Sequence, residues 1–239
     1  MKFTTSDKIF EKFPGLHVGV VVAKNIDNSG DDKKIFKLLE EVEELIKLDF
    51  VPEKSIAVEL IQKKLAKHKL ISVWRAAYED LGVKPEHYST NVEAMMVDIL
   101  QGKTIKKENK LVDCYNYLSL KHIIPLGADD LDKVKGDISL RFATGDENFI
   151  GEEKPEKDEV IYADDEGALC RKWNWKECER TKITKETKNA VVYIDGLPPI
   201  TKDKLEKILK EAKELIEMFC NGSVSYYFLS KFKNSVELK

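Results

Sequence analysis

The chain has 239 residues, of which 42% are hydrophobic and 35% are charged, and its formal net charge is −3. This balance is typical of a globular protein and excludes a disordered one, and the length suffices to bury a large core without disulfides. The net charge is slightly negative, so no overall positive field is available to hold nucleic acid, and DNA is not expected as a partner.

The four cysteines are dispersed, and none forms a C-x-x-C pair or lies at zinc-ligand spacing from a histidine. We expect them to be reduced, small apolar residues, and we expect no metal or other cofactor. The N-terminus lacks an apolar leader, and no apolar run approaches ~18 residues. The sequence therefore predicts a soluble, cytoplasmic protein with no membrane partner.

The first half of the chain is mainly helical in its pattern. Leu16–Ala23 is β-branched and almost wholly apolar, which predicts a buried strand. Apolar residues three and four apart predict a helix from Asp31, and Pro52 is expected to begin a second one. A third helix over 71–81 ends at Gly82, and a short fourth one follows the cap Ser89-Thr90.

The second half is richer in strands. Asp113 is expected to cap a helix, and Pro125–Asp130 is predicted to be a turn in which Gly127 takes a positive φ. The pattern then predicts strands over 138–143, 160–163, 168–173, 190–194 and 224–229, a hairpin turn over 164–167, a charged surface loop over 152–159, and a helix from Leu205 to Phe219.

Helices in the first half and strands in the second favour an α+β fold, a mixed sheet flanked by helices, over a doubly wound parallel one. No linker divides the chain. We therefore expect one domain over 1–239, with a helical N-terminal half (31–102), a central region (111–197) and a C-terminal helix (201–220).

The run Arg171-Lys172-Trp173-Asn174-Trp175 contains two of the three tryptophans beside an arginine. If it were a strand, Arg171, Trp173 and Trp175 would share one face, with Lys172 and Asn174 on the other. A guanidinium beside two indoles can bind a carboxylate or phosphate while the rings hold a planar group. The alternative, a core tryptophan pair covered by the arginine, has equal weight.

Two further groups of polar residues are candidates for a site. Asp113 and Asn116 lie three apart, on one side of a helix, where an asparagine can orient a carbonyl; a capping aspartate and a loop-tethering asparagine are the simpler interpretation. Glu177, Glu179 and Thr187 belong to a hydrogen-bonding run before the next strand, although Thr187 alone would be an ordinary turn cap.

Four motifs occur in an order that resembles a known family. They are Leu-Val-Asp-Cys-Tyr-Asn-Tyr (111–117), Pro-Leu-Gly-Ala-Asp-Asp-Leu-Asp (125–132), Gly-Asp-Ile-Ser-Leu-Arg-Phe-Ala (136–143) and Gly-Asp-Glu-Asn-Phe (145–149). Together they resemble the editing module (B3/B4) of the bacterial phenylalanyl-tRNA synthetase beta subunit. The runs 170–175 and 181–187 are more similar to free-standing members, which lack the catalytic core of the synthetase. The resemblance extends from the first strand to Leu197.

The resemblance implies an α+β fold with a pocket at the sheet, where the synthetase hydrolyses tyrosine wrongly esterified to the phenylalanine tRNA. The Val-Asp-x-x-Asn-Tyr motif of the family matches Asp113, Asn116 and Tyr117. A pocket carboxylate that reads the tyrosine hydroxyl falls near Glu177 or Glu179. The chain departs from the family at Gly127, where the synthetase has a pocket histidine.

These residues lead to the hypothesis of a trans-editing deacylase for mischarged tRNA, with no aminoacylation activity. The expected catalytic residues are Asn116, Glu177 and Glu179. The aminoacylated 3′ end of a tRNA is the expected partner, and a set of residues is expected to bind it: Asp113, Tyr117, Gly127, Arg171, Trp173, Asn174, Trp175 and Thr187. The competing hypothesis is a non-catalytic module that binds tRNA or a free amino acid.

Overall fold

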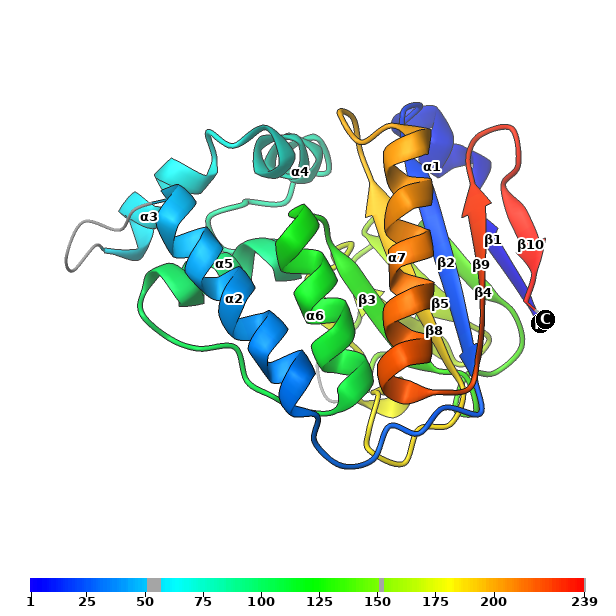
Figure 1. The fold of residues 1–239 in the computed structure, drawn as a ribbon. Helices are drawn as coiled ribbons and strands as arrows, with labels where there is room; N and C mark the ends of the chain where they lie inside the picture. Colours follow the sequence, from blue (N-terminus) through cyan, green and yellow to red (C-terminus); the bar gives the residue numbers. More distant parts are fainter. Residues whose placement is uncertain (51–56, 151–152, 239) are drawn as a thin grey trace.

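The structure, a computed structural model, describes residues 1–50, 57–150 and 153–238. Its strands form two sheets, and helices α2, α6 and α7 lie side by side against one of them (Figure 1). The α+β class is as predicted, with the strands divided between two sheets. No described helix has the length and apolar character needed to cross a membrane.

The smaller sheet is antiparallel, with strand order β3-β8-β2-β9. The larger sheet has the order β10-β1-β4-β5-β6-β7 and is mixed, because β1 and β4 run parallel. The strands are β1 (Lys2–Thr5), β2 (His17–Lys24), β3 (Leu126–Asp130), β4 (Ile138–Phe142), β5 (Val160–Asp164), β6 (Gly167–Arg171), β7 (Lys176–Glu177), β8 (Ala190–Gly196), β9 (Ser223–Leu229) and β10 (Ser235–Glu237).

The helices follow the apolar stripes of the sequence. They are α1 (Asp7–Lys12), α2 (Lys33–Phe50), α3 (Val58–Leu65), α4 (Lys69–Asp80), α5 (Asn91–Leu100), α6 (Lys110–His122), the 3₁₀ turn η1 (Glu179–Thr181) and α7 (Lys202–Cys220). The predicted helix end at Gly82 is confirmed, because Gly82 has a φ of 73°, the left-handed conformation that glycine tolerates. The predicted start at Pro52 lies outside the described residues.

β2 is buried on both faces, which explains its unbroken apolar run. Val18, Val20 and Val22 face the larger sheet, whereas Val21 and Ala23 pack in the cluster that contains α2, α6 and α7. The smaller sheet is thus the middle layer, between those helices and the larger sheet. A further apolar cluster joins α2, α3, α4 and α5 beside these layers.

Gly19 of β2 allows α7 to approach the smaller sheet closely. A Cβ at this position would lie 2.7 Å from Leu209 Cδ2, well inside van der Waals contact. Overpacking of this kind costs about 1–3 kcal/mol. We therefore expect Gly19→Ala to lower the free energy of unfolding by that amount in urea titration. In the Leu209→Ala background the same change should cost less, and equal costs in the two backgrounds would contradict this contact.

Three local predictions outside the 171–175 run are wrong. Residues 126–130 form strand β3 rather than a turn, and Gly127 has no positive φ, because β3 pairs with β8 along its whole length. Asn109, not Asp113, caps α6, accepting a hydrogen bond from Val112 N at 3.1 Å. Glu159, placed in a surface loop, is buried. The short elements β1, α1, β7 and β10 were not predicted, since each is too short to show a period.

Candidate functional site

A pocket of about 490 Å³ opens where the edges of the two sheets meet. β3 is one edge of the smaller sheet and β7 is an edge of the larger one. The two are joined by the Glu177 carboxylate, whose Oε1 accepts a hydrogen bond from Ala128 N at 3.2 Å. Helices α5 and α6 and the loop between them complete the walls. The pocket therefore depends on segments that are far apart in the sequence.

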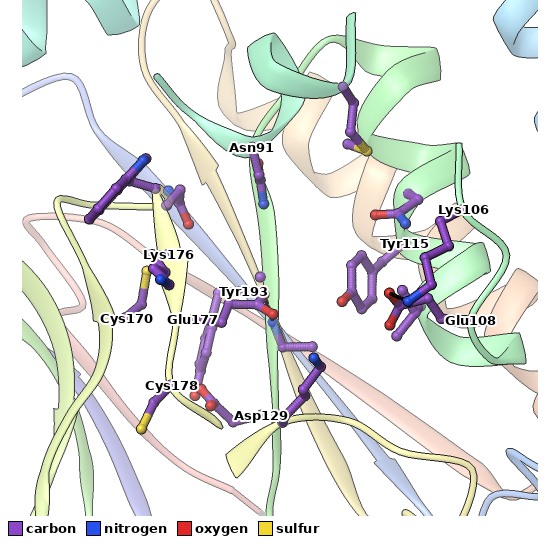
Figure 2. Close-up of a pocket in the computed structure, with 18 of the residues that line it drawn as sticks. Asn91, Lys106, Glu108, Tyr115, Asp129, Cys170, Lys176, Glu177, Cys178 and Tyr193 are labelled. Carbon is purple, nitrogen blue, oxygen red and sulfur yellow. Dashed lines mark hydrogen bonds and ion pairs between the residues drawn. The ribbon is translucent and has the colours of Figure 1, made fainter. Parts of the chain in front are cut away.

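Figure 2 shows the polar side chains that converge on this pocket from these elements. Tyr115 comes from α6, whereas Glu177, Asp129 and Tyr193 come from the strands. The full lining also includes Asn91, Met95, Asp98, Thr104, Ile105, Lys106, Glu108, Val112, Asn116, Gly127, Ala128, Tyr162, Cys170, Asn174, Trp175, Lys176, Cys178, Glu179 and Lys182. The site thus has carboxyl groups on the strand side and an amide and a phenol on the helix side.

Glu177 and Asp129 form a pair of interacting carboxyl groups. Burial, reinforced by the charge of Asp129, raises the pKa of Glu177 to about 8. Burial also raises the pKa of Asp129 to about 7, against the opposing effect of hydrogen bonds from Thr181 and Tyr193. Both carboxyl groups therefore exchange protons near neutral pH, the range in which a side chain can serve as an acid or a base.

This pair makes folding stability depend on pH. Each folded-state pKa lies above the ordinary value, 4.5 for Glu177 and 3.8 for Asp129. Below these ordinary pKa values, the two raised pKa values make their full contribution to the free energy of unfolding. As pH rises, the unfolded chain releases protons that the folded chain keeps, so stability is lost until pH passes about 8 for Glu177. We expect Glu177→Gln to show a smaller fall in Tm between about pH 5 and 8 than the wild type; parallel curves would contradict this.

The facing wall, on α6, offers hydrogen-bond donors. Tyr115 is largely buried, and burial holds its pKa well above the ordinary value, so its hydroxyl stays protonated. The half-exposed Asn116 amide lines the pocket and makes no hydrogen bond with the described residues. A phenol and an amide can both donate to an oxygen atom that gains negative charge.

Lysines lie around the pocket together with acidic partners. Lys106 is 3.0 Å from Glu108, and Lys182 is 3.5 Å from Glu179, each measured between ammonium and carboxylate atoms. Lys176 Nζ lies 6.0 Å from the ring centre of Trp175. The side chains of Lys106 and Lys182 are well exposed, so these pairs are weak and can exchange for phosphate groups.

The turn between β6 and β7 is built from three successive left-handed residues. Lys172, Trp173 and Asn174 have φ values of 43°, 41° and 70°, a conformation that is strained for side chains other than glycine. The Tyr78 hydroxyl holds the turn by sharing its one proton between the carbonyl oxygens of Lys172 (2.7 Å) and Trp173 (2.8 Å). The predicted strand alternation over 171–175 is therefore wrong.

Asp195 of β8 fixes the same turn from within the core. Its carboxylate accepts hydrogen bonds from Trp173 Nε1 at 3.2 Å, Asn174 Nδ2 at 2.8 Å and the Tyr162 hydroxyl at 2.8 Å. Burial raises the pKa of Asp195 to about 6, and these donors oppose the rise. The Asn174 amide is thereby oriented with its nitrogen toward Asp195.

The predicted site residues divide into two groups. Asn116, Gly127, Asn174, Trp175, Glu177 and Glu179 all line the pocket. Within this group Glu179 is exposed and paired with Lys182, so it lies toward solvent, whereas Glu177 is half-buried. The structure thus brings Asn116 of the predicted Asp-x-x-Asn segment and part of the tryptophan run to one cavity.

Arg171 and Trp173 do not reach this pocket. Trp173 is fully buried between the layers, 4.9 Å from both Trp74 and Phe13 between ring centres. The Arg171 guanidinium donates to both carboxylate oxygens of the buried Glu159, at 3.1 and 3.0 Å. The three left-handed residues explain the position of Trp173, because they turn its side chain inward and separate it from Trp175.

Asp113, Tyr117 and Thr187 also have structural positions outside the pocket lining. Asp113 is buried and accepts a hydrogen bond from Glu108 N at 3.0 Å, which anchors the loop before α6. Tyr117 packs against two apolar clusters. The Thr187 hydroxyl donates to Asp130 at 2.8 Å in the turn before β8. The assignment of these three to substrate binding has no support in the geometry.

Sequence reasoning missed several residues that line the pocket, above all Asp129, Tyr115 and Tyr193. An aspartate inside an apolar strand such as β3 was the available signal for Asp129, hidden by the assignment of 125–130 to a turn. In the part of the chain that the structure describes, no group of three or more His, Cys, Asp or Glu residues is placed to hold a metal ion. All four cysteines are free and buried, as predicted.

Sequence comparisons with known proteins agree with the resemblance found in the motifs. The sequence model of the B3/4 domain matches residues 73–221. The phenylalanine–tRNA ligase beta subunit of Fusobacterium nucleatum is 32% identical over 111 residues, which are 45% of this chain and 13% of that subunit. An N-terminal fragment of the phenylalanyl-tRNA synthetase beta subunit from Pyrococcus horikoshii aligns over 93% of this chain and 49% of its own, with 12% identity and a TM-score of 0.43. The chain thus spans only a small part of the Fusobacterium subunit.

Proposed function

The chain belongs to the B3/4 domain family, and from this premise we propose that it hydrolyses the ester bond of aminoacyl-tRNA as a free-standing editing enzyme. One observation carries the proposal: the pocket places a carboxyl pair with near-neutral pKa values opposite the Tyr115 and Asn116 donors. That arrangement offers a proton acceptor on one side of a bound ester and donors for its oxygen on the other.

The dimensions and charges of the pocket suit the end of an aminoacylated RNA. A volume of about 490 Å³ is within the range of small-molecule sites and accommodates an aminoacyl group with part of a nucleoside. Trp175 offers an indole at the pocket for stacking on a base, and Lys106 and Lys182 are available to phosphates. The tRNA end would then enter past the lysines, with the amino acid toward Glu177.

Hydrolysis of an activated ester needs a positioned water molecule and a stabilised oxyanion rather than a strong nucleophile. In the proposed reaction, Glu177 accepts a proton from a water molecule as its oxygen bonds to the ester carbon. Tyr115 and Asn116 donate hydrogen bonds to the carbonyl oxygen as it becomes negative. The C–O bond to the ribose then breaks, and the proton returns to the ribose oxygen, giving a free amino acid and a free RNA end.

The geometry also suggests how the chain works with Gly127 where the synthetase has a histidine. A Cβ at Gly127 would lie only 3.3 Å from Glu177 Oε1. A side chain at position 127 would therefore press against the Glu177 carboxylate. This supports Glu177 as the group that replaces the histidine beside the ester.

The test is deacylation of a panel of tRNAs, each charged with a wrong amino acid, by the purified chain. Release of the amino acid faster than in buffer alone, for at least one member, is the expected result. Rates equal to the buffer blank for every member would overturn the enzymatic proposal. Retention of the RNA in a filter-binding assay would then indicate the non-catalytic binding module.

A further inference from the structure

The side-chain carbonyl oxygen of Asn174, Oδ1, is held in place as an acceptor that faces the pocket. Its amide nitrogen donates to the buried Asp195, so Oδ1 is directed away from that carboxylate. Asn174 is 4% exposed, and within the described residues its Oδ1 accepts no hydrogen bond. The Asn174 carbonyl oxygen of the main chain accepts from Asn91 N at 2.9 Å, which fixes the residue further. An oriented acceptor is thus left for a donor from outside the chain.

A second acceptor, Glu177 Oε1, lies beside the same face of Gly127. The position of a Cβ on Gly127 would lie 3.3 Å from Glu177 Oε1 and 3.8 Å from Asn174 Oδ1. We call this space, bounded by Gly127, Asn174 Oδ1 and Glu177 Oε1, the Gly127 cradle. Because residue 127 is glycine, no side chain projects from it between these two oxygens.

The charges around the cradle select a cation. Asp129 is the charged group with the largest effect on Glu177, and in its ionised form it adds a negative charge beside the cradle. Lys182 exerts a smaller opposing effect and is paired with Glu179. Two converging oxygens provide too few ligands for a metal ion, but they match the N–H groups of an ammonium.

We propose that the Gly127 cradle binds the protonated α-amino group of an aminoacyl substrate, through Asn174 Oδ1 and Glu177 Oε1. Naming the amine as that of an aminoacyl group rests on the proposed function. The contact orients the adjacent ester toward Tyr115 and Asn116, and it leaves Glu177 Oε2 for the attacking water. Substrates whose amino group is acylated or absent are then excluded, which confines the site to free aminoacyl ends.

The test uses ligands that cannot be hydrolysed. They are the 3′-amino-3′-deoxyadenosine amides of alanine, leucine, serine and tyrosine, each paired with the des-amino amide of the same side chain. We measure Kd by calorimetry and compare the two members of the tightest pair. A charged hydrogen bond predicts that the amine binds at least about tenfold more tightly than its des-amino partner. A ratio near one, or no binding by any amide at millimolar concentration, overturns the proposal.

Variants locate the contact. Gly127→Ala places a methyl group in the cradle without changing charge, and its backbone tolerates alanine because its φ is not positive. The amine preference should fall to near one in Gly127→Ala and in Asn174→Ala, and it should persist in Glu214→Gln, a control on the exposed face of α7. Melting curves check that each variant is folded, and a preference retained in folded Gly127→Ala overturns the proposal.

This experiment separates the cradle from the reaction. Preference for the amine without any deacylation would support amine binding at the Gly127 cradle and contradict the proposed hydrolysis. Deacylation of free and N-acetylated aminoacyl-tRNA at equal rates would support the proposed hydrolysis and contradict amine binding at the Gly127 cradle.

Discussion

Replacing Glu177 with glutamine is expected to lower the rate of deacylation by about 100-fold or more, the range that loss of a general base produces. Glutamine keeps the shape of the side chain and an acceptor oxygen for Ala128 N, so the fold and the edge-to-edge contact of the sheets are retained. The measurement is the single-turnover release of the amino acid from mischarged tRNA, corrected for the buffer blank.

The pH profile distinguishes a base from a structural role. The pKa of Glu177 is about 8, so the carboxylate form grows as pH rises toward that value, and the corrected rate of the wild type should rise with it. In Glu177→Gln the rise should disappear. Glu214→Gln, on the exposed face of helix α7, should match the wild type at every pH. A Glu177→Gln enzyme with a wild-type rate would show that the proton acceptor lies elsewhere.

Replacing Arg171 with alanine is expected to destabilise the fold strongly without changing the pocket. The change leaves the Glu159 carboxylate, 7% exposed, without its bidentate partner. Breaking a buried pair costs about 3–5 kcal/mol, and we expect the lower end because Lys172 Nζ remains 3.3 Å from Glu159. Urea titration gives the change in free energy of unfolding.

The controls for Arg171 separate stability from binding. Lys37→Ala removes an exposed partner of Glu41 and should change stability by less than about 1 kcal/mol. At a temperature where Arg171→Ala is folded, its Kd for the aminoacyl amides should equal that of the wild type, since Arg171 does not line the pocket. A large loss of affinity with normal stability would restore the phosphate-binding role first expected for Arg171.

Local patterns were sufficient for most elements of the fold. The apolar run at 16–23, the helical stripe from Leu205 to Phe219 and the hairpin turn at 164–167 all lie where the sequence predicts them. Periodicity and turn residues act over a few neighbours, so they can be recognised without the rest of the chain. The motifs also indicated the family and six of the residues that line the pocket.

The tertiary structure alone decided which of the polar candidates share the site. The turn at 172–174 takes its left-handed shape from distant Tyr78 and Asp195, and this shape buries Trp173 while Asn174 and Trp175 reach the pocket. Asp129 and Glu177 acquire near-neutral pKa values only when two sheet edges meet and exclude water. Sequence determined the elements because backbone preferences are local, whereas burial and proton affinity depend on what the complete fold brings together.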